Sequence, residues 1–342
     1  MTRRERRERG AADATDPVGD ATLALLVEVA GTPKPGNVDR HRDLDDLRFE
    51  SFLGGAVGAR AGLELAAETA NGGSADEAPA VGEAFERAVE GMAARAGTNT
   101  QFGCLLLLTP LVRAAADPDW DLSPAGVDAV CRGTTVDDAV AFYRAFEAVD
   151  VAVDDPPSGA ADLDVRRGSD AEPALREREA TLRDVLALSA EAADSTDSDR
   201  VSDRNAAEWV EGFPRTFRAA EWILTDEGPL ADRAARAFLG LLAAEPDTLV
   251  ASARGAETAR EASTRARATL EPDEGEPNEG DATGPVGSVD AVDAETVHRA
   301  DRAAAESLAE AFVAEGINPG TTADLTCAAL FVALRRGAEV TP

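Results

Sequence analysis

The stretch FGCLLLLTPLVRAA, residues 102–115, carries apolar side chains on nearly every side of a helix. A helix of this kind is buried at the centre of a protein, and Pro110 predicts an interruption within it. In the flanking sequence apolar side chains recur at three- and four-residue spacing, whereas alternating runs typical of strands are nearly absent. The sequence therefore predicts an all-α fold built around this helix.

The other expected helices resemble one another in character, which indicates one bundle-like domain rather than several. Asp20 is a candidate N-cap for the first helix. The expected ranges are 21–30, 47–70, 81–96, 135–149, 175–193, 205–224, 229–244, 247–269, 293–315 and 322–336.

Three stretches rich in Asp, Gly, Pro or Ser break the helical pattern, near 151–173, 194–203 and 271–291. Their composition predicts solvated acidic loops inserted into the helical body. Residues 1–19 begin with several arginines but lack the apolar core of a signal peptide, so they predict a disordered arm. We therefore expect one helical domain over residues 20–337.

The chain has 342 residues, a formal net charge of -31 and a sequence pI of about 4.3. This charge argues against binding to nucleic acid or to an anionic membrane surface, since both need a basic face. The acidic excess and the near absence of lysine are typical of proteins from salt-loving archaea, where salt screens the repulsion between carboxylates. Codon bias is the alternative explanation, but it accounts less well for the acidic residues.

The three cysteines, Cys104, Cys131 and Cys327, are few, odd in number and far apart. They indicate neither a disulfide framework nor a paired-cysteine metal site, and they favour a reducing, cytoplasmic setting. Apolar runs long enough to cross a membrane are absent from the sequence. The sequence does not indicate an oligomeric state.

Polar residues that are rare in this chain gather in three segments, the first of which is GTPKPGNVDRHRDLDD, residues 31–46. It holds Lys34, the only lysine of the chain. The prolines on both sides stiffen the loop, and Gly36 permits a positive φ or close approach to a ligand. A stiff loop presenting Lys34, Asn37 and Arg40 would suit a phosphate group.

Asp43, Asp45 and Asp46 follow in the same segment. Carboxylates coordinate Mg²⁺, which bridges phosphate oxygens, so together with the cations they would suit a nucleoside triphosphate. The alternative is that these aspartates stabilise the first turn of a helix. His41 is a candidate for proton transfer, or a structural hydrogen-bonding group.

The second segment, AGTNTQFG, places Thr98, Asn99 and Thr100 just before the central helix. These residues could cap that helix, or its free N–H groups could meet an anion. Cys104, on the same helix, is expected in the core.

The third segment, NPGTTADLTC, begins at Asn318 and leads into the last helix. Thr321 or Thr322 would cap this helix. Thr321 and Asp324 have capping-box spacing, so Asp324 is either structural or a ligand. Cys327 is expected in the core.

Together these segments resemble the triphosphoribosyl-dephospho-CoA synthase family, which carries the motifs TPKPG.VDR, D-x-D-x-x-T-F, G.NTHKG and NPGG.AD. The counterparts in this chain are residues 32–40, 43–49, 97–103 and 318–324. The motifs follow one another in the same order as in the family, and the resemblance covers roughly residues 20–337 apart from the acidic insertions.

The resemblance implies an all-helical enzyme that takes ATP and 3'-dephospho-CoA, releases adenine, and attaches the triphosphoribosyl unit to a ribose hydroxyl. It implies that Mg²⁺, Lys34 and Arg40 hold the triphosphate. One carboxylate among Asp43, Asp45 and Asp46 would stabilise the developing cation or accept a proton. Asp324 joins these three as a possible metal ligand. Gly36, Asn37, Thr98, Asn99, Thr100, Asn318 and Thr321 are the remaining candidate nucleotide contacts.

The chain departs from the family at NTQFG, where Gln101 and Phe102 replace His and Lys, and at Arg48, where Thr is usual. We therefore keep two alternatives to transfer onto dephospho-CoA. One is transfer to a different acceptor in coenzyme biosynthesis, such as a pterin. The other is a nucleotide-binding protein without catalysis.

Overall fold

The structure is a computed structural model that describes residues 16–68, 80–117, 121–156, 159–191, 201–270 and 289–340. Within these ranges the chain is helical and contains no β-strand, only an isolated bridge between Asp39 and Arg42. The prediction of an all-α fold is therefore confirmed. No helix in the described ranges is both long and apolar enough to cross a membrane.

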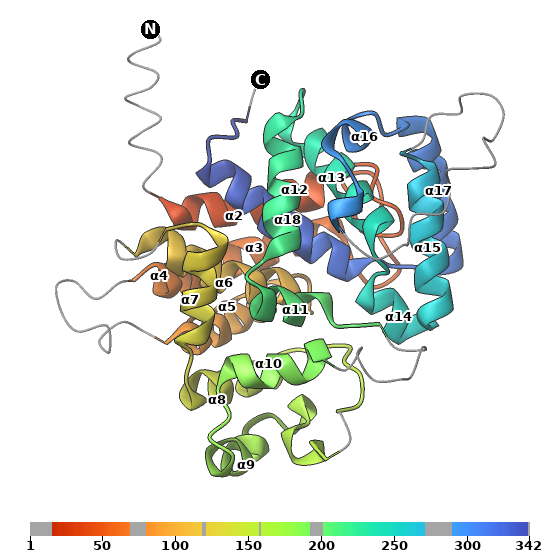
Figure 1. The fold of residues 1–342 in the computed structure, drawn as a ribbon. Coiled ribbons are helices and arrows are strands. Elements are labelled where there is room, and N and C mark those ends of the chain that lie inside the picture. The colour runs from red at the N-terminus through yellow and green to blue at the C-terminus, as the bar shows by residue number, and fades with distance from the viewer. Residues whose placement is uncertain are drawn as a thin grey trace, which may run out of the picture.

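The helices pack against one another, and some are joined by long connections such as residues 31–48 between α2 and α3 (Figure 1). The α-helices are α2 (Pro17–Ala30), α3 (Phe49–Gly58), α4 (Arg60–Ala67), α5 (Val81–Ala96), α6 (Phe102–Ala116), α7 (Pro124–Arg132), α8 (Val136–Ala145), α9 (Glu172–Glu177), α10 (Leu182–Glu191), α11 (Arg204–Glu211), α12 (Pro214–Thr225), α13 (Leu230–Ala244), α14 (Thr248–Arg254), α15 (Ala256–Ala268), α16 (Ala294–His298), α17 (Arg302–Glu315) and α18 (Gly320–Arg335). The 3₁₀ helices are η2 (Ala161–Leu163), η3 (Val165–Ala171) and η4 (Val289–Ala291).

Two helices, α6 and α18, form the centre of the core. Both are buried over most of their length, and they contact each other. Around α18 lie α2, α11, α12, α13 and α14, while α8, α9 and α10 gather at one end of the molecule (Figure 1). The fold thus places the start of α18, and with it the third polar segment, against several helices.

The interruption expected at Pro110 does not occur, because α6 continues through this residue. Proline has no N–H to donate to the carbonyl four residues earlier, here that of Leu106. The indole N–H of Trp209 on α11 donates to that carbonyl at 3.2 Å instead. A tertiary contact therefore supplies the hydrogen bond that the proline removes.

Several expected helices are each divided into two. The range 47–70 becomes α3 and α4, with the junction at Ala59. The range 205–224 breaks where Gly212 and Phe213 both have positive φ, at 82° and 63°. The range 247–269 breaks at Gly255, with a φ of 91°. A residue with positive φ cannot continue an α-helix, so the chain is redirected at Gly212, Phe213 and Gly255, whereas Ala59 keeps a helical φ of -68°.

The first helix starts earlier than expected. Asp16 is its N-cap, because its side chain accepts from the N–H of Gly19 at 3.0 Å, and Pro17 takes the first helical position. Asp20 lies inside α2 and pairs with Arg335 at 2.9 Å. The arm predicted over 1–19 falls mostly outside the described residues.

The predicted insertions are only partly described. The range 151–173 contains η2, η3 and the start of α9, so it is not wholly loop. Of the other two predicted insertions, residues 194–200 and 271–288 lie outside the described residues. Their described ends are 201–203, which form no helix, and 289–291, which form η4.

Candidate functional site

The first polar segment lies inside the protein, since residues 31–39 are all buried. Lys34 is 1% exposed, and its Nζ lies 2.5 Å from Glu28 Oε1 and 3.1 Å from Asn37 Oδ1. Glu28 is buried on α2. Lys34 and Asn37 therefore do not face solvent as the expected phosphate grip would require.

The first segment contacts the third through two adjacent residues. Gly36 has a φ of 72°, and a Cβ at this position would lie 1.9 Å from the carbonyl oxygen of Ile317. Next to it, Asn37 Nδ2 donates to Asn318 Oδ1 at 2.9 Å. Only glycine fits a position that is both left-handed and this close to another backbone.

The rest of the first segment turns outward around Asp39. Thr32 Oγ1 donates to Asp39 Oδ2 at 2.9 Å, and Arg42 pairs with the same oxygen at 2.9 Å and with Glu306. Arg40 is partly exposed and lies 3.5 Å from Asp232. The cations of this segment thus each have an acidic partner.

The predicted catalytic and metal-binding side chains of this segment lie at the surface. Asp43, Asp45, Asp46 and His41 are exposed. Asp43 Oδ1 accepts from the N–H of Phe49, the first residue of α3, at 2.7 Å. For Asp43 the structure matches the alternative in which the aspartate stabilises a helix start.

The second segment enters α6 with one capping contact. Asn99 Oδ1 accepts from the N–H of Phe102 at 3.2 Å, while Thr98 is exposed. Thr100 Oγ1 and Gln101 Oε1 are buried and have no hydrogen-bond partner among the described residues. Capping of α6 thus needs only Asn99.

Phe102, which stands where the family has Lys, belongs to a cluster of aromatic rings. Its ring centroid lies 5.0 Å from that of Phe85 and 4.9 Å from that of Phe146, both edge-on, and 6.4 Å from that of Phe142. This position is therefore an apolar contact between α5, α6 and α8.

The second segment contacts the third through Gly103. A Cβ at Gly103 would lie 1.9 Å from Asp324 Oδ2 and 2.6 Å from Asn205 Nδ2. Asp324 Oδ2 accepts from Asn205 Nδ2 at 2.8 Å, and Cys104 Sγ donates to Asp324 Oδ1 at 3.2 Å. The side chains of Asn205, Asp324 and Asn318 are only partly buried. We call Lys34, Asn37, Asn205, Asn318 and Asp324 the polar junction.

The capping predicted for α18 is wrong. Its N-cap is Pro319, whose ring offers no capping oxygen, and Asp324 faces Asn205 rather than forming a box with Thr321. Thr322 Oγ1 donates instead to Asp247 Oδ2 at 2.7 Å, and the Thr322 N–H donates to the same oxygen. A buried aspartate ahead of α14 takes the bonds that a local cap would have supplied.

Burial sets the ionisation of the junction. Desolvation, with the negative charges of Glu28 and Asp247, raises the pKa of Asp324 to about 7, although hydrogen bonds from Asn205 and Cys104 oppose the rise. Desolvation also raises the pKa of Glu28 against the effect of Lys34, and it raises the pKa of the Cys327 thiol. A carboxyl that titrates near neutrality is a candidate for proton transfer.

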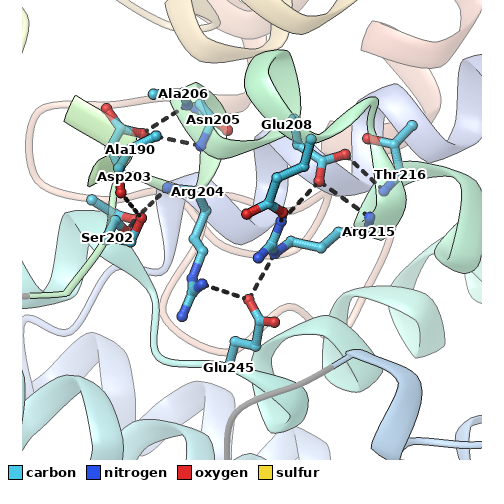
Figure 2. Close-up of polar contacts among 12 residues, drawn as sticks. Ala190, Ser202, Asp203, Arg204, Asn205, Ala206, Glu208, Arg215, Thr216 and Glu245 are labelled. Carbon is cyan, nitrogen blue, oxygen red and sulfur yellow. Dashed lines mark hydrogen bonds and ion pairs between the residues drawn. The ribbon is translucent and has the colours of Figure 1, made fainter. Parts of the chain in front are cut away.

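Beside the junction, two arginines share the buried carboxylate of Glu245 (Figure 2). Arg215 Nε lies 2.7 Å from Glu245 Oε2, Arg204 Nη1 lies 3.0 Å from the same oxygen, and Arg215 Nη1 lies 3.3 Å from Glu208. The adjoining pocket has free space of about 10 Å³, room for one water molecule. The polar residues lining it are Arg204, Arg215, Glu245, Asp247, Thr321 and Thr322.

Several residues of the site were not singled out from the sequence. Asn205 could have been, because it is one of six asparagines and three of the others lie in the polar segments. Glu28 is the only charged residue in the otherwise apolar run 21–30, which is also a signal. Asp247 and the thiol of Cys104 carried no comparable signal in so acidic a chain.

The four aspartates proposed as metal ligands do not come together in this structure. Asp43, Asp45 and Asp46 are exposed, whereas Asp324 bonds Asn205 and Cys104 inside. Within the described ranges no group of three or more His, Cys, Asp or Glu side chains is arranged to hold a metal ion. Asp324 therefore does not fit a magnesium site shared with the other three.

Comparison with known proteins finds both a family and a solved structure that resemble this chain. The model of the family CitG, ATP:dephospho-CoA triphosphoribosyl transferase, matches residues 15–341. A crystal structure from Archaeoglobus fulgidus, of a "putative triphosphoribosyl-dephospho-coA synthase", has the same fold, with a TM-score of 0.55 and 22% sequence identity. That match covers 83% of this chain and 99% of the other. No curated protein is similar enough to the chain to count as a match.

Proposed function

Because the chain belongs to the family of ATP:dephospho-CoA triphosphoribosyl transferases and is therefore a transferase, we propose that it binds ATP at the polar junction. One observation carries the location: Asn37 bonds Asn318, and Gly103 lies against Asp324. The three segments that resemble the family's motifs, far apart in sequence, thus meet at one place. Asn205, Asn318 and Asp324 are partly exposed there, whereas Lys34 and Asn37 are buried.

The reaction breaks the bond between C1' of the ATP ribose and N9 of adenine, and the bonding electrons leave with adenine. A hydroxyl oxygen of the acceptor forms the new bond to C1'. The acceptor hydroxyl loses one proton and adenine gains one, so the transfer is balanced. The chain must therefore supply groups that move a proton and hydrogen-bond donors that hold the triphosphate.

The polar junction is closed in this structure, so nucleotide binding requires a rearrangement. Lys34 and Asn37 contact a phosphate only when the pair with Glu28 opens and the loop 31–39 moves. Arg40, Thr98 and Thr100 lie nearer the surface and are proposed as phosphate contacts, with Thr321 at the start of α18. Closure of loops around a substrate is common in enzymes and excludes water from the reaction.

For Mg²⁺ we propose the arrangement usual for nucleotide enzymes, in which the ion binds the triphosphate and only one or two carboxylates. Exposed Asp45 and Asp46 fit that requirement, whereas Asp324 does not. The ion would neutralise charge on the triphosphate. His41 and Asp43 remain candidates for contact with the substrate at this edge.

Phe102 bears on the identity of the acceptor, since it removes a cation from a position that the family fills with Lys. Dephospho-CoA is the acceptor that the family's name gives, and a different coenzyme precursor is the alternative.

The test is chromatographic measurement of adenine release from ATP in high salt with Mg²⁺, with and without dephospho-CoA. Release that depends on dephospho-CoA supports the proposal. Release only with another acceptor supports the alternative. Binding of ATP without release under any acceptor supports a non-catalytic protein.

For the cellular setting we propose a salt-rich cytoplasm. A net charge of -31 favours salt that screens carboxylate repulsion, and the three cysteines are free and buried.

A further inference from the structure

The side chain of Asn205 has a hydrogen-bonding group that the protein leaves unused. Its Nδ2 donates to Asp324, but its Oδ1 is buried and has no partner among the described residues. A buried acceptor without a partner costs about 1–3 kcal/mol, so its presence needs an explanation. A ligand that brings an N–H group to this atom would supply one.

The surrounding structure holds Asn205 in place from its backbone. Asp203 caps α11 by accepting from the N–H groups of Asn205 and Ala206 at 3.0 and 3.1 Å (Figure 2). Thr248 Oγ1 accepts from the Arg204 N–H at 3.1 Å. The amide is therefore positioned by the first turn of α11 rather than by its own contact with Asp324 alone.

Asp324 bonds only neutral donors, the amide of Asn205 and the thiol of Cys104. The charged or titratable groups around it are Glu28 on α2, Cys104 on α6, Asp247 before α14 and Cys327 on α18, while Lys34 is paired with Glu28. Burial and the nearby negative charges favour the protonated carboxyl, and they outweigh the two hydrogen bonds, which favour the ionised form. Its Oδ1, which meets only a weakly bonding thiol, can then donate a proton to a ligand.

We infer that Asn205 and Asp324 together bind the imidazole edge of the adenine of ATP, an inference that rests on the proposed function. Asn205 Oδ1 accepts from the exocyclic amino group, and the Asp324 carboxyl donates to N7. An asparagine amide commonly reads this same edge of adenine in DNA. Here the carboxyl takes the place of the amide N–H, which already bonds Asp324.

This contact gives the leaving group its proton. As the C1'–N9 bond breaks, the bonding pair stays on adenine, and the proton on Asp324 passes to N7. The acceptor oxygen bonds C1', and the proton that it loses restores the carboxyl for the next turnover. No oxidant or further reactant enters this balance.

The experiment compares ATP with two analogues in the full-length wild-type protein, with dephospho-CoA as acceptor. ITP carries an oxygen in place of the amino group, and 7-deaza-ATP carries a C–H in place of N7. We expect kcat/KM at least about 10-fold lower for ITP than for ATP, because Asn205 Oδ1 then faces an acceptor. We expect 7-deaza-ATP to bind but to lose its base at least about 100-fold more slowly.

Two substitutions at Asn205 separate selectivity from general damage. Asn205→Ala should lower kcat/KM for ATP but hardly for ITP, so that the ratio falls towards 1. Asn205→Asp keeps an acceptor and should keep the selectivity for ATP, with a lower rate. Asp324→Asn should bind ATP within about threefold of wild type and release adenine at least about 100-fold more slowly. Asp137→Asn, an exposed substitution on α8, is the matched control, and thermal melting verifies that each variant is folded.

The outcomes distinguish this inference from the proposed function. Equal use of ATP and ITP by wild type, or an unchanged ratio in Asn205→Ala, overturns the inference while adenine release still supports the transferase. If wild type releases no base with any acceptor, the proposed function fails, and the ratio of ATP to ITP affinities in calorimetry decides the inference instead. A protein that does not bind ATP overturns both.

Discussion

Lys34 Nζ lies 2.5 Å from Glu28 Oε1, and both side chains are 1% exposed. The only lysine of the chain is therefore half of an ion pair within a packed core. Asn37 completes the contact and in turn bonds Asn318. The pair thus connects α2 to the loop 31–39 and to the start of α18, so its first effect is on the folding of the site.

Lys34→Ala is expected to lower the free energy of unfolding by about 3–5 kcal/mol, because it leaves Glu28 buried without a counter-charge. Lys34→Met combined with Glu28→Gln removes both charges and should recover much of that loss. Guanidinium denaturation in high salt measures each value. Arg60→Ala is the control, since its pair with Glu64 is exposed and should contribute less than about 1 kcal/mol. Equal losses in Lys34→Ala and Arg60→Ala would contradict the role of the buried pair.

The raised pKa of Asp324 predicts that the stability of the protein depends on pH. Its pKa is about 7 in the folded state and about 3.9 in an unfolded chain, so folding favours the protonated form. The stabilisation from this proton is complete below about pH 4 and is lost as the pH rises through 7. Asp324→Asn cannot ionise, so its gain in stability over wild type should grow from about 1 kcal/mol near pH 5 to about 4 kcal/mol near pH 8. Urea denaturation across this range measures the difference, and a constant difference would argue against a raised pKa.

The helical content and the three polar segments could be predicted from sequence, because periodicity and rare residues are local signals. The burial of Lys34 could not, since it depends on Glu28, six residues earlier, and on a loop that folds inward at Gly36. Stiffness between two prolines indicated a fixed loop, but it carried no information about which side of the loop faces solvent.

The predicted helix boundaries were wrong for a related reason. The breaks at Phe213 and Gly255 lie within periodic apolar patterns, and a positive φ at one residue leaves no trace in such a pattern. The role of Asp324 was left open between a cap and a ligand. Its partner Asn205 lies 119 residues away, and such pairs have no local signature.

Gly103→Ala tests the contact between the second and third segments. The added Cβ would lie 1.9 Å from Asp324 Oδ2, so Asp324 must move and its bond to Asn205 must break. We expect adenine release to fall by about 10-fold or more, since small displacements of a reacting group are costly. Gly133→Ala is the control, because the nearest atom to its Cβ would be at 3.4 Å, an ordinary contact. Full activity in Gly103→Ala would show that Asp324 need not hold this position.

Phe102→Lys restores the residue that the family has at this position, yet we expect it to destabilise the protein rather than to improve catalysis. The new ammonium would replace a ring among Phe85, Phe142 and Phe146, and burying a charge against apolar rings is costly. The expected loss is about 3–5 kcal/mol of unfolding free energy, measured by denaturation. Phe102→Leu should lose less, as an apolar side chain remains. A rise in adenine release in Phe102→Lys would mean that this position faces the substrate.

Trp209 and Pro110 should show coupled energies, because the indole N–H replaces the hydrogen bond that proline removes from Leu106. Trp209→Phe keeps most of the buried ring but leaves the Leu106 carbonyl without a donor, at a cost of about 1–3 kcal/mol beyond the lost packing. In a Pro110→Ala background the alanine N–H can reach that carbonyl through the helix itself, so the same substitution should cost less. A double-mutant cycle of unfolding free energies measures the difference, expected to be about 1 kcal/mol in favour of the alanine background. A coupling energy of zero would mean that the indole contributes only its packing, and that α6 tolerates Pro110 without this bond.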